Sequence, residues 1–368
     1  MEYIKIKDIL EFKKKSKIKA SEGLKIGKYN FYTSSKEQNK FLDYYEYSNE
    51  ALIIGTGGNA NIHHSYGKFS VSTDCFVLEN KANKFFLLEY IYKYLLKNIH
   101  IIENGFRGAG LKHISKEYLE NIEIPIISLE KQKKLIKNLK NIDTFIDKNK
   151  QIKNELNFLN KSLFKAQFFS CDKSFEKKKL KDSVIEMFIG PFGSDLKNET
   201  FVEKEKGYCV VYEQKHAIKK IIDDNIRYIT KEKYETLKRF RVDAGDIIVS
   251  CRGTIGRIFI LPNYAKFGII HPSLMKIKLK EDKYKNTFFE KLLEKYMQEN
   301  LYSTQGSSIK MAITAKKLGE EYFILPPIEL QNKFVERVEK IEKLSFEIEK
   351  SIKEAENLYN SLMNKYFE

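Results

Sequence analysis

The stretches ISKEYLENIEIPIISLEKQKKLI (114–136) and ITAKKLGEEYFILPPIELQNKFV (313–335) align without gaps at an offset of 199 residues. The alignment pairs Leu119 with Leu318, and it pairs Gln132 with Gln331. Shared spacing of apolar residues alone would be weak support for a duplication. However, both copies also carry Glu-x-Gln shortly after a segment that contains proline, and we call this segment the joint. The chain therefore contains an internal duplication.

Upstream of the joint the two copies match more weakly. Residues 69–77 can be laid on 267–275, and Ile53-Ile54 on Ile247-Ile248. The segment 6–8 matches 180–182 at an offset of 174, so the second copy is longer by 199 − 174 = 25 residues. Short β-branched runs bounded by Gly and Asn indicate many short strands in both copies.

A long helix follows each joint. Segments 129–168 and 329–368 contain no Gly or Pro, and their apolar residues recur at helical spacing. One heptad row in each helix predicts a helix-pair interface, with Asn149 as a register-setting polar residue. The interface residues are Leu135, Ile142, Asn149, Leu156, Leu163, Phe334, Ile341, Ile348 and Leu362. A second row is expected at Phe145, Ile152, Leu159 and Ala166 in the first helix and at Leu344 and Leu358 in the other.

The charges of the two helices favour their pairing. The first has 10 Lys and 4 acidic residues, net +6, and the second has 7 basic and 9 acidic residues, net −2. Opposite net charges attract, so packing of the helices against each other is the simplest arrangement. The alternative is two unrelated surface helices, each docked on its own domain, because short heptad repeats are weak support for a coiled coil.

The sequence predicts an α/β (α+β) protein with four segments. We expect mixed globular domains at 1–128 and 171–327, and long helices at 129–170 and 328–368. The length of 368 residues suits two domains of ordinary size. Hydrophobic residues make up 42%, which supplies enough material for two cores.

Charge and cysteine usage narrow the function classes. The formal net charge is 66 − 50 = +16, which favours a polyanionic partner, with nucleic acid ahead of an anionic membrane surface. The four cysteines form no Cys-x-x-Cys pair, so we expect reduced, mostly buried thiols. No apolar run is long enough for a signal peptide or membrane span, and we expect a cytoplasmic protein.

Strings typical of enzymes are present but incomplete. GTGGNA (55–60) fits G-x-G-x-x-A, yet the residues after it are a poor helix start, and a phosphate site depends on a helix amino terminus. FRGAG (106–110) matches the F-x-G-x-G string of adenine methyltransferases, without the Asp/Asn-Pro-Pro-Tyr/Phe element that holds a flipped base. Neither a Walker A loop nor a metal-binding cluster is found. The sequence gives no positive case for catalysis, a resident cofactor or a bound metal.

Polar and basic residues gather on loops between the expected strands. Arg, Lys, Asn and Gln can contact base edges, while Lys, Ser and backbone amides hold phosphates. The candidate DNA-binding residues are Ser35, Lys36, Gln38, Asn39, Asn59, Asn61, His63, Arg107, Gln214, Lys215, Arg239, Arg241, Arg252, Arg257 and Lys310.

With its duplication, its two long helices and its basic charge, the chain resembles the specificity subunit of type I restriction-modification systems. The likeness covers essentially the whole chain. It is carried by the joints IEIPIISLEKQ (122–132) and FILPPIELQ (323–331), which resemble the family's IPLPPLEEQ element. YNFYTSSKEQNKFLD (29–43), ALIIGTGGNANIH (51–63), IGPFGSDLK (189–197), RYITKEKYETLKRFRVDAGDIIVSCRGTIGR (227–257) and GIIHPSL (268–274) support it. The first joint departs from the pattern with Ile126-Ile127-Ser128, but one proline is enough to set the helix entry.

The resemblance implies two target-recognition domains and an antiparallel coiled coil formed by the two helices. It implies a non-catalytic subunit that reads the two halves of a bipartite double-stranded DNA site. Two modification subunits would use S-adenosylmethionine to methylate adenine N6, and restriction subunits would use ATP and Mg. A 40-residue helix is about 60 Å long and half-sites one helical turn apart are ~34 Å apart, so the helix pair could fix the spacer. The outer faces at 131–140 and 336–343 would dock the modification subunits.

Two other functions stay open at this point. One is a stand-alone DNA methyltransferase or nuclease, for which FRGAG is the sequence support. The other is a coiled-coil scaffold that binds no DNA, with the basic charge serving solubility. The DNA sequence recognised by the chain cannot be read from its residues.

Overall fold

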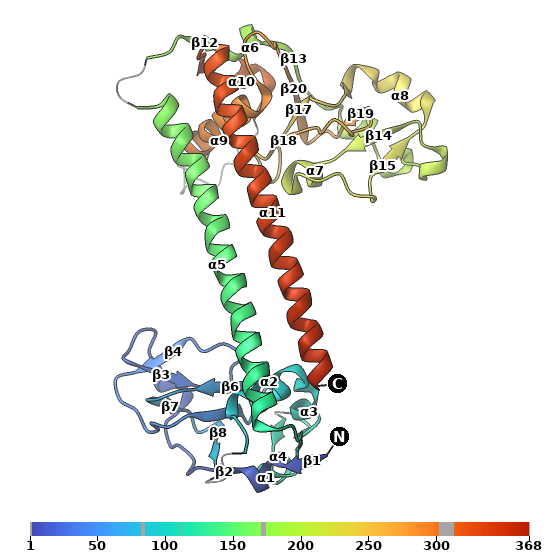
Figure 1. The fold of residues 1–368 in the computed structure, drawn as a ribbon. Coiled ribbons are helices and arrows are strands. Elements are labelled where there is room, and N and C mark those ends of the chain that lie inside the picture. Colours follow the sequence, from blue (N-terminus) through green and yellow to red (C-terminus); the bar gives the residue numbers. More distant parts are fainter. Residues whose placement is uncertain (1, 82–84, 111, 171–173, 302–312, 368) are drawn as a thin grey trace. The chain divides into compact units, whose positions relative to one another are not determined.

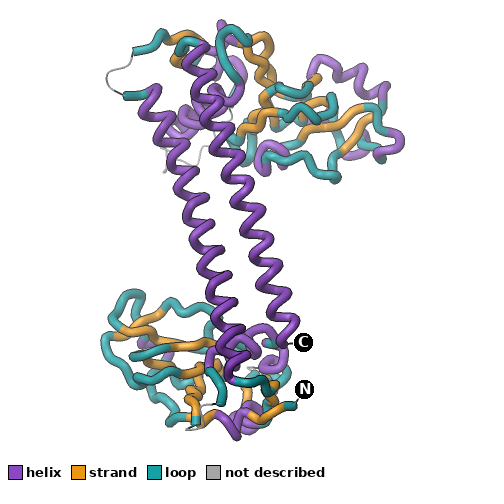
Figure 2. The backbone as a smooth tube through the Cα atoms, viewed as in Figure 1, coloured by secondary structure: helices purple, strands orange, loops and turns teal. Residues whose placement is uncertain are grey.

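The computed structural model describes residues 2–81, 85–110, 112–170, 174–301 and 313–367. It divides into two compact units, one formed by 1–153 with 347–368 and the other by 154–346. Each unit therefore holds one globular domain and a stretch of each long helix. Both units mix helices and strands, as Figure 2 shows. Candidate Lys310 and Cys171 lie outside the described residues.

The first unit begins with two sheets that pack face to face. The elements are β1 (Tyr3–Lys5), α1 (Ile6–Ile9), β2 (Leu10–Phe12), β3 (Tyr29–Tyr32), β4 (Lys40–Leu42), β5 (Ala51–Gly55), β6 (Ile62–Ser65), β7 (Phe69–Val71) and β8 (Cys75–Asn80). An antiparallel sheet has the strand order β2-β8-β5-β6, and a smaller sheet has the order β4-β3-β7 with β3 and β7 parallel.

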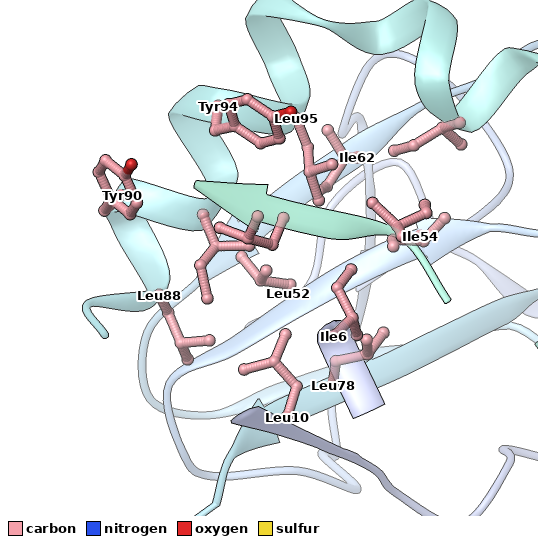
Figure 3. Packing of buried hydrophobic residues seen from close by; sticks show 14 of the residues in the cluster. Ile6, Leu10, Leu52, Ile54, Ile62, Leu78, Leu88, Tyr90, Tyr94 and Leu95 are labelled. Carbon is pink, nitrogen blue, oxygen red and sulfur yellow. The ribbon is translucent and has the colours of Figure 1, made fainter. Parts of the chain in front are cut away.

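Helices cover the other face of the larger sheet. The elements are α2 (Leu88–Lys97), α3 (Ile99–Glu103), β9 (Phe106–Arg107), β10 (His113–Ile114), α4 (Lys116–Glu120), β11 (Glu123–Pro125) and α5 (Leu129–Phe168). Leu52 and Ile54 of β5 point into a core with Leu88 and Leu95 of α2, as Figure 3 shows. Ile53, between them, faces the smaller sheet instead. This alternation is the period of a strand buried on both faces.

The second unit repeats this plan. Its elements are β12 (Lys177–Lys179), α6 (Leu180–Ser183), β13 (Val184–Ile189), β14 (Cys209–Tyr212), α7 (Gln214–Lys219), β15 (Arg227–Ile229), α8 (Lys231–Leu237), β16 (Arg241–Val242), β17 (Ile247–Ser250), β18 (Ile258–Ile260), β19 (Gly268–Ile270), β20 (Leu274–Leu279), α9 (Asn286–Leu301), α10 (Ala315–Glu320), β21 (Tyr322–Ile324) and α11 (Ile328–Phe367). Its sheets have the orders β13-β20-β17-β18 and β15-β14-β19-β16, with β14 and β19 parallel. Figure 1 labels most of these strands. The predicted duplication of a mixed α/β domain followed by a long helix is confirmed.

The strand pairing corrects the upstream alignment by one residue. Ile53 pairs with Val77 in the first unit, and Ile248 pairs with Lys276, which lies 199 residues after Val77. Ile53 therefore corresponds to Ile248 rather than to Ile247. Likewise Phe69 corresponds to Gly268, because each pairs with the second residue of a four-residue strand, Asn30 of β3 and Val210 of β14. A slip of one residue exchanges the two faces of a strand. Ile53 is buried against the sheet that contains β3, and Ile248 against the sheet that contains β14, which supports the corrected register.

The helices α5 and α11 run antiparallel where they meet. In the first unit Lys150 lies 3.9 Å from Glu356 and Lys153 lies 3.0 Å from Glu349, so rising numbers in one helix meet falling numbers in the other. In the second unit the rings of Phe164 and Phe334 are 5.4 Å apart. The predicted contact between the two helices is thus present within each unit, and the two ion pairs of the first unit show its antiparallel direction.

The first predicted heptad row faces inward. Leu135 and Phe334 are each 1% exposed. The others are half-buried: Ile142, Asn149, Leu156, Leu163, Ile341, Ile348 and Leu362. The side-chain amide of Asn149 donates to the carbonyl of Phe145 in its own helix at 2.8 Å.

The predicted second row is wrong. Phe145 is 47% exposed, Leu159 43% and Leu344 46%, and the interface residue Leu358 is 53% exposed. The inward second row of α5 lies one residue later, at the buried Leu139 and Ile146, and continues as half-buried Lys153, Asn160 and Gln167. The sequence offers apolar residues on both sides of the first row, so apolarity alone did not decide which side faces the partner helix.

The described cysteines are isolated from one another and from solvent. Cys75, Cys209 and Cys251 are free and buried, as predicted. Burial raises the pKa of each of these three thiols to about 11, so they are poor nucleophiles. Within the described ranges, no helix is long and apolar enough to cross a membrane.

Candidate nucleic-acid interface

Three chain segments meet at one end of the first unit's sheets, and we call residues 33–35, 56–61 and 72–74 the first loop edge. Ser34 joins them. Its hydroxyl oxygen accepts hydrogen bonds from the amides of Thr56 at 3.1 Å and Gly57 at 3.3 Å, and it donates to the carbonyl of Asp74. A single short side chain therefore fixes all three segments relative to one another.

Two histidines extend the first loop edge. His63 Nε2 lies 2.8 Å from the carbonyl of Ser35, and burial lowers the pKa of His63, so the neutral ring donates this bond. His113 Nδ1 lies 3.2 Å from the carbonyl of Thr56. Because His113 pairs with Arg107 across β9 and β10, Arg107 is brought beside the same loops.

The second unit has a corresponding set of segments, 213–215, 251–257 and 271–273, which we call the second loop edge. The side-chain amide of Gln214 donates to the carbonyls of Arg252 at 2.6 Å and Thr254 at 3.1 Å. The amide of Cys251 donates to the carbonyl of Ser273 at 2.9 Å. Gly253 has a φ of 66°, which suits glycine in this tight loop.

The two loop edges occupy equivalent places in the fold. Tyr32 is the last residue of β3, and its backbone carbonyl accepts a hydrogen bond from the amide of Ser72 at 2.8 Å. Tyr212 is the last residue of β14, and its backbone carbonyl accepts a hydrogen bond from the amide of His271 at 2.9 Å. Ser34 and Gln214 each come two residues after these tyrosines, and each side chain binds the backbone of the next loop. The duplication thus preserves the scaffold of the edge while the loop residues differ.

The structure leaves nine of the candidate residues exposed. One of them is Arg241, and the other eight are Ser35, Lys36, Asn39, Asn59, Arg107, Arg239, Arg252 and Arg257. Arg252 and Arg257 lie in the same loop of the second edge, and the guanidinium of Arg239 stacks over Phe240 at 4.5 Å. Their contact with DNA stays a prediction.

Five other candidates are buried or half-buried, and their side chains form hydrogen bonds with the backbone of their own unit. Asn61 is 4% exposed and donates to the carbonyl of Asn59 at 2.9 Å, so this candidate side chain is buried and is not presented to DNA. A Cβ at Gly55 would come within 2.5 Å of the Asn61 amide, which shows how tightly it is packed. Gln38, His63, Gln214 and Lys215 are half-buried. Gln38 donates to the carbonyl of Lys40, and Lys215 to that of Asn225.

Arg241 is exposed but its guanidinium is held inside the unit. It donates to both carboxylate oxygens of Asp243 at 2.7 to 3.1 Å, and to the hydroxyl of Tyr234 at 3.4 Å. The hydrogen bonds to Asp243 raise the pKa of Arg241, and the same bonds lower the pKa of Asp243. Arg241 therefore braces β16 rather than extending to a ligand.

Sequence reasoning missed the turns 72–74 and 271–273, which no charged motif marks. Within the second turn, His271 Nδ1 lies 2.8 Å from the hydroxyl of Ser273. It also missed Arg227, which is bonded to Asn198 at 3.1 Å. The only signal for the turns is their fixed position after the strands that pair in parallel with β3 and β14.

A second surface lies on the helix pair of the first unit. Phe145 and Leu358 line a groove of about 380 Å³, together with Asn141, Ile142, Ser351, Glu354 and Ala355. The residues that correspond to Phe145 and Leu358 at the offset of 199 are Leu344 and Leu159, and both are exposed in the second unit. An exposed apolar pair therefore recurs in each unit.

Comparison with known proteins agrees with this architecture. The family model of the type I restriction modification DNA specificity domain matches residues 1–157 and 173–356. The chain is 26% identical over 338 residues to the type I restriction enzyme MjaVIII specificity subunit of Methanocaldococcus jannaschii, covering 86% of this chain and 77% of that one. It is 26% identical over 362 residues to the EcoBI specificity subunit of Escherichia coli, covering 86% and 73%. The crystal structure of a type I system S subunit from M. genitalium superposes with a TM-score of 0.62 at 16% identity, covering 100% and 96%.

Proposed function

The chain belongs to the type I restriction-modification DNA specificity family, and from this premise we propose that its two loop edges read two different half-sites of one bipartite DNA target. As a specificity subunit it recognises DNA sequence and is the non-catalytic member of such a system. The stand-alone methyltransferase or nuclease and the DNA-free scaffold gain no support from the family match.

The repetition of the loop edge carries this proposal. Ser34 and Gln214 hold equivalent loops at the ends of equivalent strands, yet the exposed residues on those loops differ. The first edge presents Asn59, and the second presents Arg252 and Arg257. Asn makes paired hydrogen bonds with adenine and Arg with guanine, so the two edges would favour different base sequences.

Fixed loops suit sequence reading because they do not need to be ordered on binding. At both edges a side chain bonded to backbone holds the loops together, while Asn59 of the first edge and Arg252 of the second are exposed. The excess of 66 basic over 50 acidic residues supplies the attraction to phosphates that acts on every sequence.

The DNA-binding step is tested with the purified chain and duplex DNA at several salt concentrations. The logarithm of the binding constant is expected to fall linearly with the logarithm of salt, with a slope of about −0.9 for each phosphate contacted. Arg252→Ala should weaken binding, while Lys266→Ala, an exposed cation in the loop between β18 and β19, serves as the matched control. Binding that ignores salt, or no binding with or without the modification partner, would return the scaffold reading.

We further infer that two modification subunits dock on the helix pair, one in each unit. What supports this is the exposed apolar pair Phe145 and Leu358 in the first unit and its counterpart Leu344 and Leu159 in the second. Exposed apolar residues that recur at the duplication offset fit two copies of one partner. A docking surface at this groove would lie beside, rather than on, the charged stretches 131–140 and 336–343, where the sequence predicts it.

We propose that the partner subunits, and not this chain, bind the cofactors of the complex. S-adenosylmethionine would be bound by the modification subunits, and ATP with Mg by restriction subunits. In this chain Phe106 of the FRGAG string is buried in the core of the first unit, and Arg107 is exposed. Among the residues that the structure describes, no group of three or more His, Cys, Asp or Glu side chains could hold a metal ion.

Docking is tested by size measurement of the complex in solution. The double variant Phe145→Ser/Leu358→Ser should release one modification subunit and retain the other, because Leu344 and Leu159 are intact. Ile26→Ser, which changes a residue 87% exposed outside the helices, should leave the full complex. Loss of both partners or of neither would contradict one docking site per unit.

A further inference from the structure

The loop after β13 presents an exposed aromatic side chain beside the second loop edge. Phe192 is 73% exposed, whereas Leu196, four residues later, is 5% exposed and Pro191 is buried. The 3-10 turn Gly193–Asp195 is closed by a hydrogen bond of 2.9 Å from the amide of Asp195 to the carbonyl of Phe192. The exposed ring thus stands on a loop that is anchored on both sides.

This loop lies against the second loop edge. The amide of Gly190 donates to the carbonyl of Leu274 at 2.9 Å. A Cβ at Gly190 would come within 2.4 Å of the carbonyl oxygen of His271, so only glycine allows the approach. Phe192 is two residues from this contact and is therefore held beside the turn 271–273.

The first unit has a lysine at the corresponding place. Phe12 pairs with Leu78, and Met187 pairs with Ile277, which lies 199 residues after Leu78. Counting five residues onward gives Lys17 in the first unit and Phe192 in the second, and both are exposed. The carbonyl of Ile18 accepts from the amide of Thr73 at 2.8 Å, so this loop also touches its loop edge. One edge has a cation at this place and the other an uncharged ring.

We propose that Phe192 is a DNA-contacting residue that inserts between two base pairs of the second half-site. This inference rests on the proposed function, since it requires DNA on the second loop edge. A phenyl ring holds no phosphate and makes no hydrogen bond with a base edge, so its contact with DNA is apolar. Insertion at a base step buries both faces of the ring, and Phe is among the side chains that proteins use as such wedges. A thymine methyl would cover only part of a ring this exposed.

The two edges then use this position differently. Lys17 attracts a phosphate at the first half-site without deforming the duplex. Phe192 unstacks a step at the second, and flexible pyrimidine–purine steps are the easiest to open. The second half-site is therefore expected to gain specificity at a step that no hydrogen bond reads.

The test uses the full chain with its modification partner and a duplex that carries the target motif, with 2-aminopurine placed in turn at each adenine of the second half-site. The wild type should raise the fluorescence at one step. Phe192→Ala should abolish that signal and weaken binding about ten- to a hundredfold, the scale of a lost aromatic stack on a base. Phe192→Tyr should retain both, and Tyr264→Ala, a residue 74% exposed in the loop between β18 and β19, should change neither.

The outcomes separate this inference from the proposed function. A wild type that binds no DNA defeats the proposed function itself. Equal binding by wild type and Phe192→Ala overturns the wedge alone, and so does weaker binding of a variant whose wild type shows no fluorescence change at any step. If Phe192→Ala instead lost the modification partner, measured by size in solution, the ring would be a protein contact and the wedge would be rejected.

Discussion

Gln132 and Gln331, 199 residues apart, make the same three side-chain hydrogen bonds in their respective units. The Gln132 carbonyl oxygen accepts from the amide of Leu87 at 2.9 Å, and its amide donates to the carbonyls of Phe85 and Ile127 at 3.0 and 2.9 Å. The Gln331 side chain accepts from the amide of Lys285 and donates to the carbonyls of Lys283 and Pro326, each at 2.9 Å. Both glutamines are 0% exposed. Each one locks the first turn of its long helix to the domain that precedes it.

Replacing either glutamine by leucine should destabilise its unit. Gln132→Leu would leave three backbone groups without the partners they have now, and each buried unsatisfied group costs about 1–3 kcal/mol. We expect the free energy of unfolding, measured with urea, to fall by about 3 kcal/mol. Asn157→Leu, at an exposed position of α5, is the control and should change stability little. A loss below about 1 kcal/mol for Gln132→Leu would show that the lock is not structural.

The ion pair between Lys153 and Glu349 should contribute modestly to helix pairing. Its atoms are 3.0 Å apart, with 33% and 65% of the side chains exposed, so solvent screens the attraction. A double-mutant cycle with Lys153→Glu and Glu349→Lys should give a coupling of about 0.2–1 kcal/mol, with the double variant more stable than either single one. Two single variants whose effects simply add would refute the contact.

Loop variants should alter one half-site at a time. Arg252→Ala is expected to relax the bases read by the second edge, at a cost of about 1–3 kcal/mol, and to leave the first half of the motif unchanged. Asn59→Ala should do the opposite. The methylated motif, sequenced from cells that express each variant, reports the change. Relaxation of both halves by one substitution would argue against separate readers.

Acid should weaken one contact of the second unit in a defined range. Lys179 and Lys181 bond the carboxylate of Glu320 at 2.8 and 2.6 Å, and the bond from Lys179 is the main cause that lowers the pKa of Glu320 from its usual 4.5 to about 2. Because the folded-state pKa is depressed, this carboxylate stabilises the fold above the unfolded value of 4.5 and loses that effect as the pH falls toward 2.

Comparison with Glu320→Gln isolates this effect. The wild type should melt at a higher temperature than Glu320→Gln at about pH 6, and the difference should shrink by about pH 3. Thermal denaturation followed by circular dichroism measures it. A difference that does not change with pH would show that the charge of Glu320 is not what stabilises this contact.

Much of the fold could be predicted from the sequence, because the two copies remain similar at the joints, where fully buried side chains tolerate few replacements. Gln132 and Gln331 align because each must accept one hydrogen bond and donate two at the start of its long helix, and the glutamine side chain does both. Between the joints the copies diverge, and a match of apolar residues shifted by one, such as Ile53 on Ile247, is as plausible in sequence as the true match with Ile248. Strand pairing decides the register, and it is a long-range property.

The candidate site was predicted less well, for a physical reason. Polar residues on loops either face solvent or hold the loop, and the sequence does not tell the two apart. Asn59 and Asn61 look alike, but one is exposed and the other is packed against Gly55. The sequence predicts Gln214 as a DNA-binding residue, whereas its side-chain amide connects its own loop to the next loop of the edge. Phe192 was overlooked because an exposed phenyl ring has no charge to mark it.

If this chain directs DNA modification to a bipartite site, methylation of that site must depend on the chain. Single-molecule sequencing of genomic DNA can compare a host that expresses the chain and its partner methyltransferase with a host that lacks only this chain. We predict a gapped N6-methyladenine motif in the first host and its loss in the second. A motif that persists without the chain, while the partner is expressed, would contradict the account.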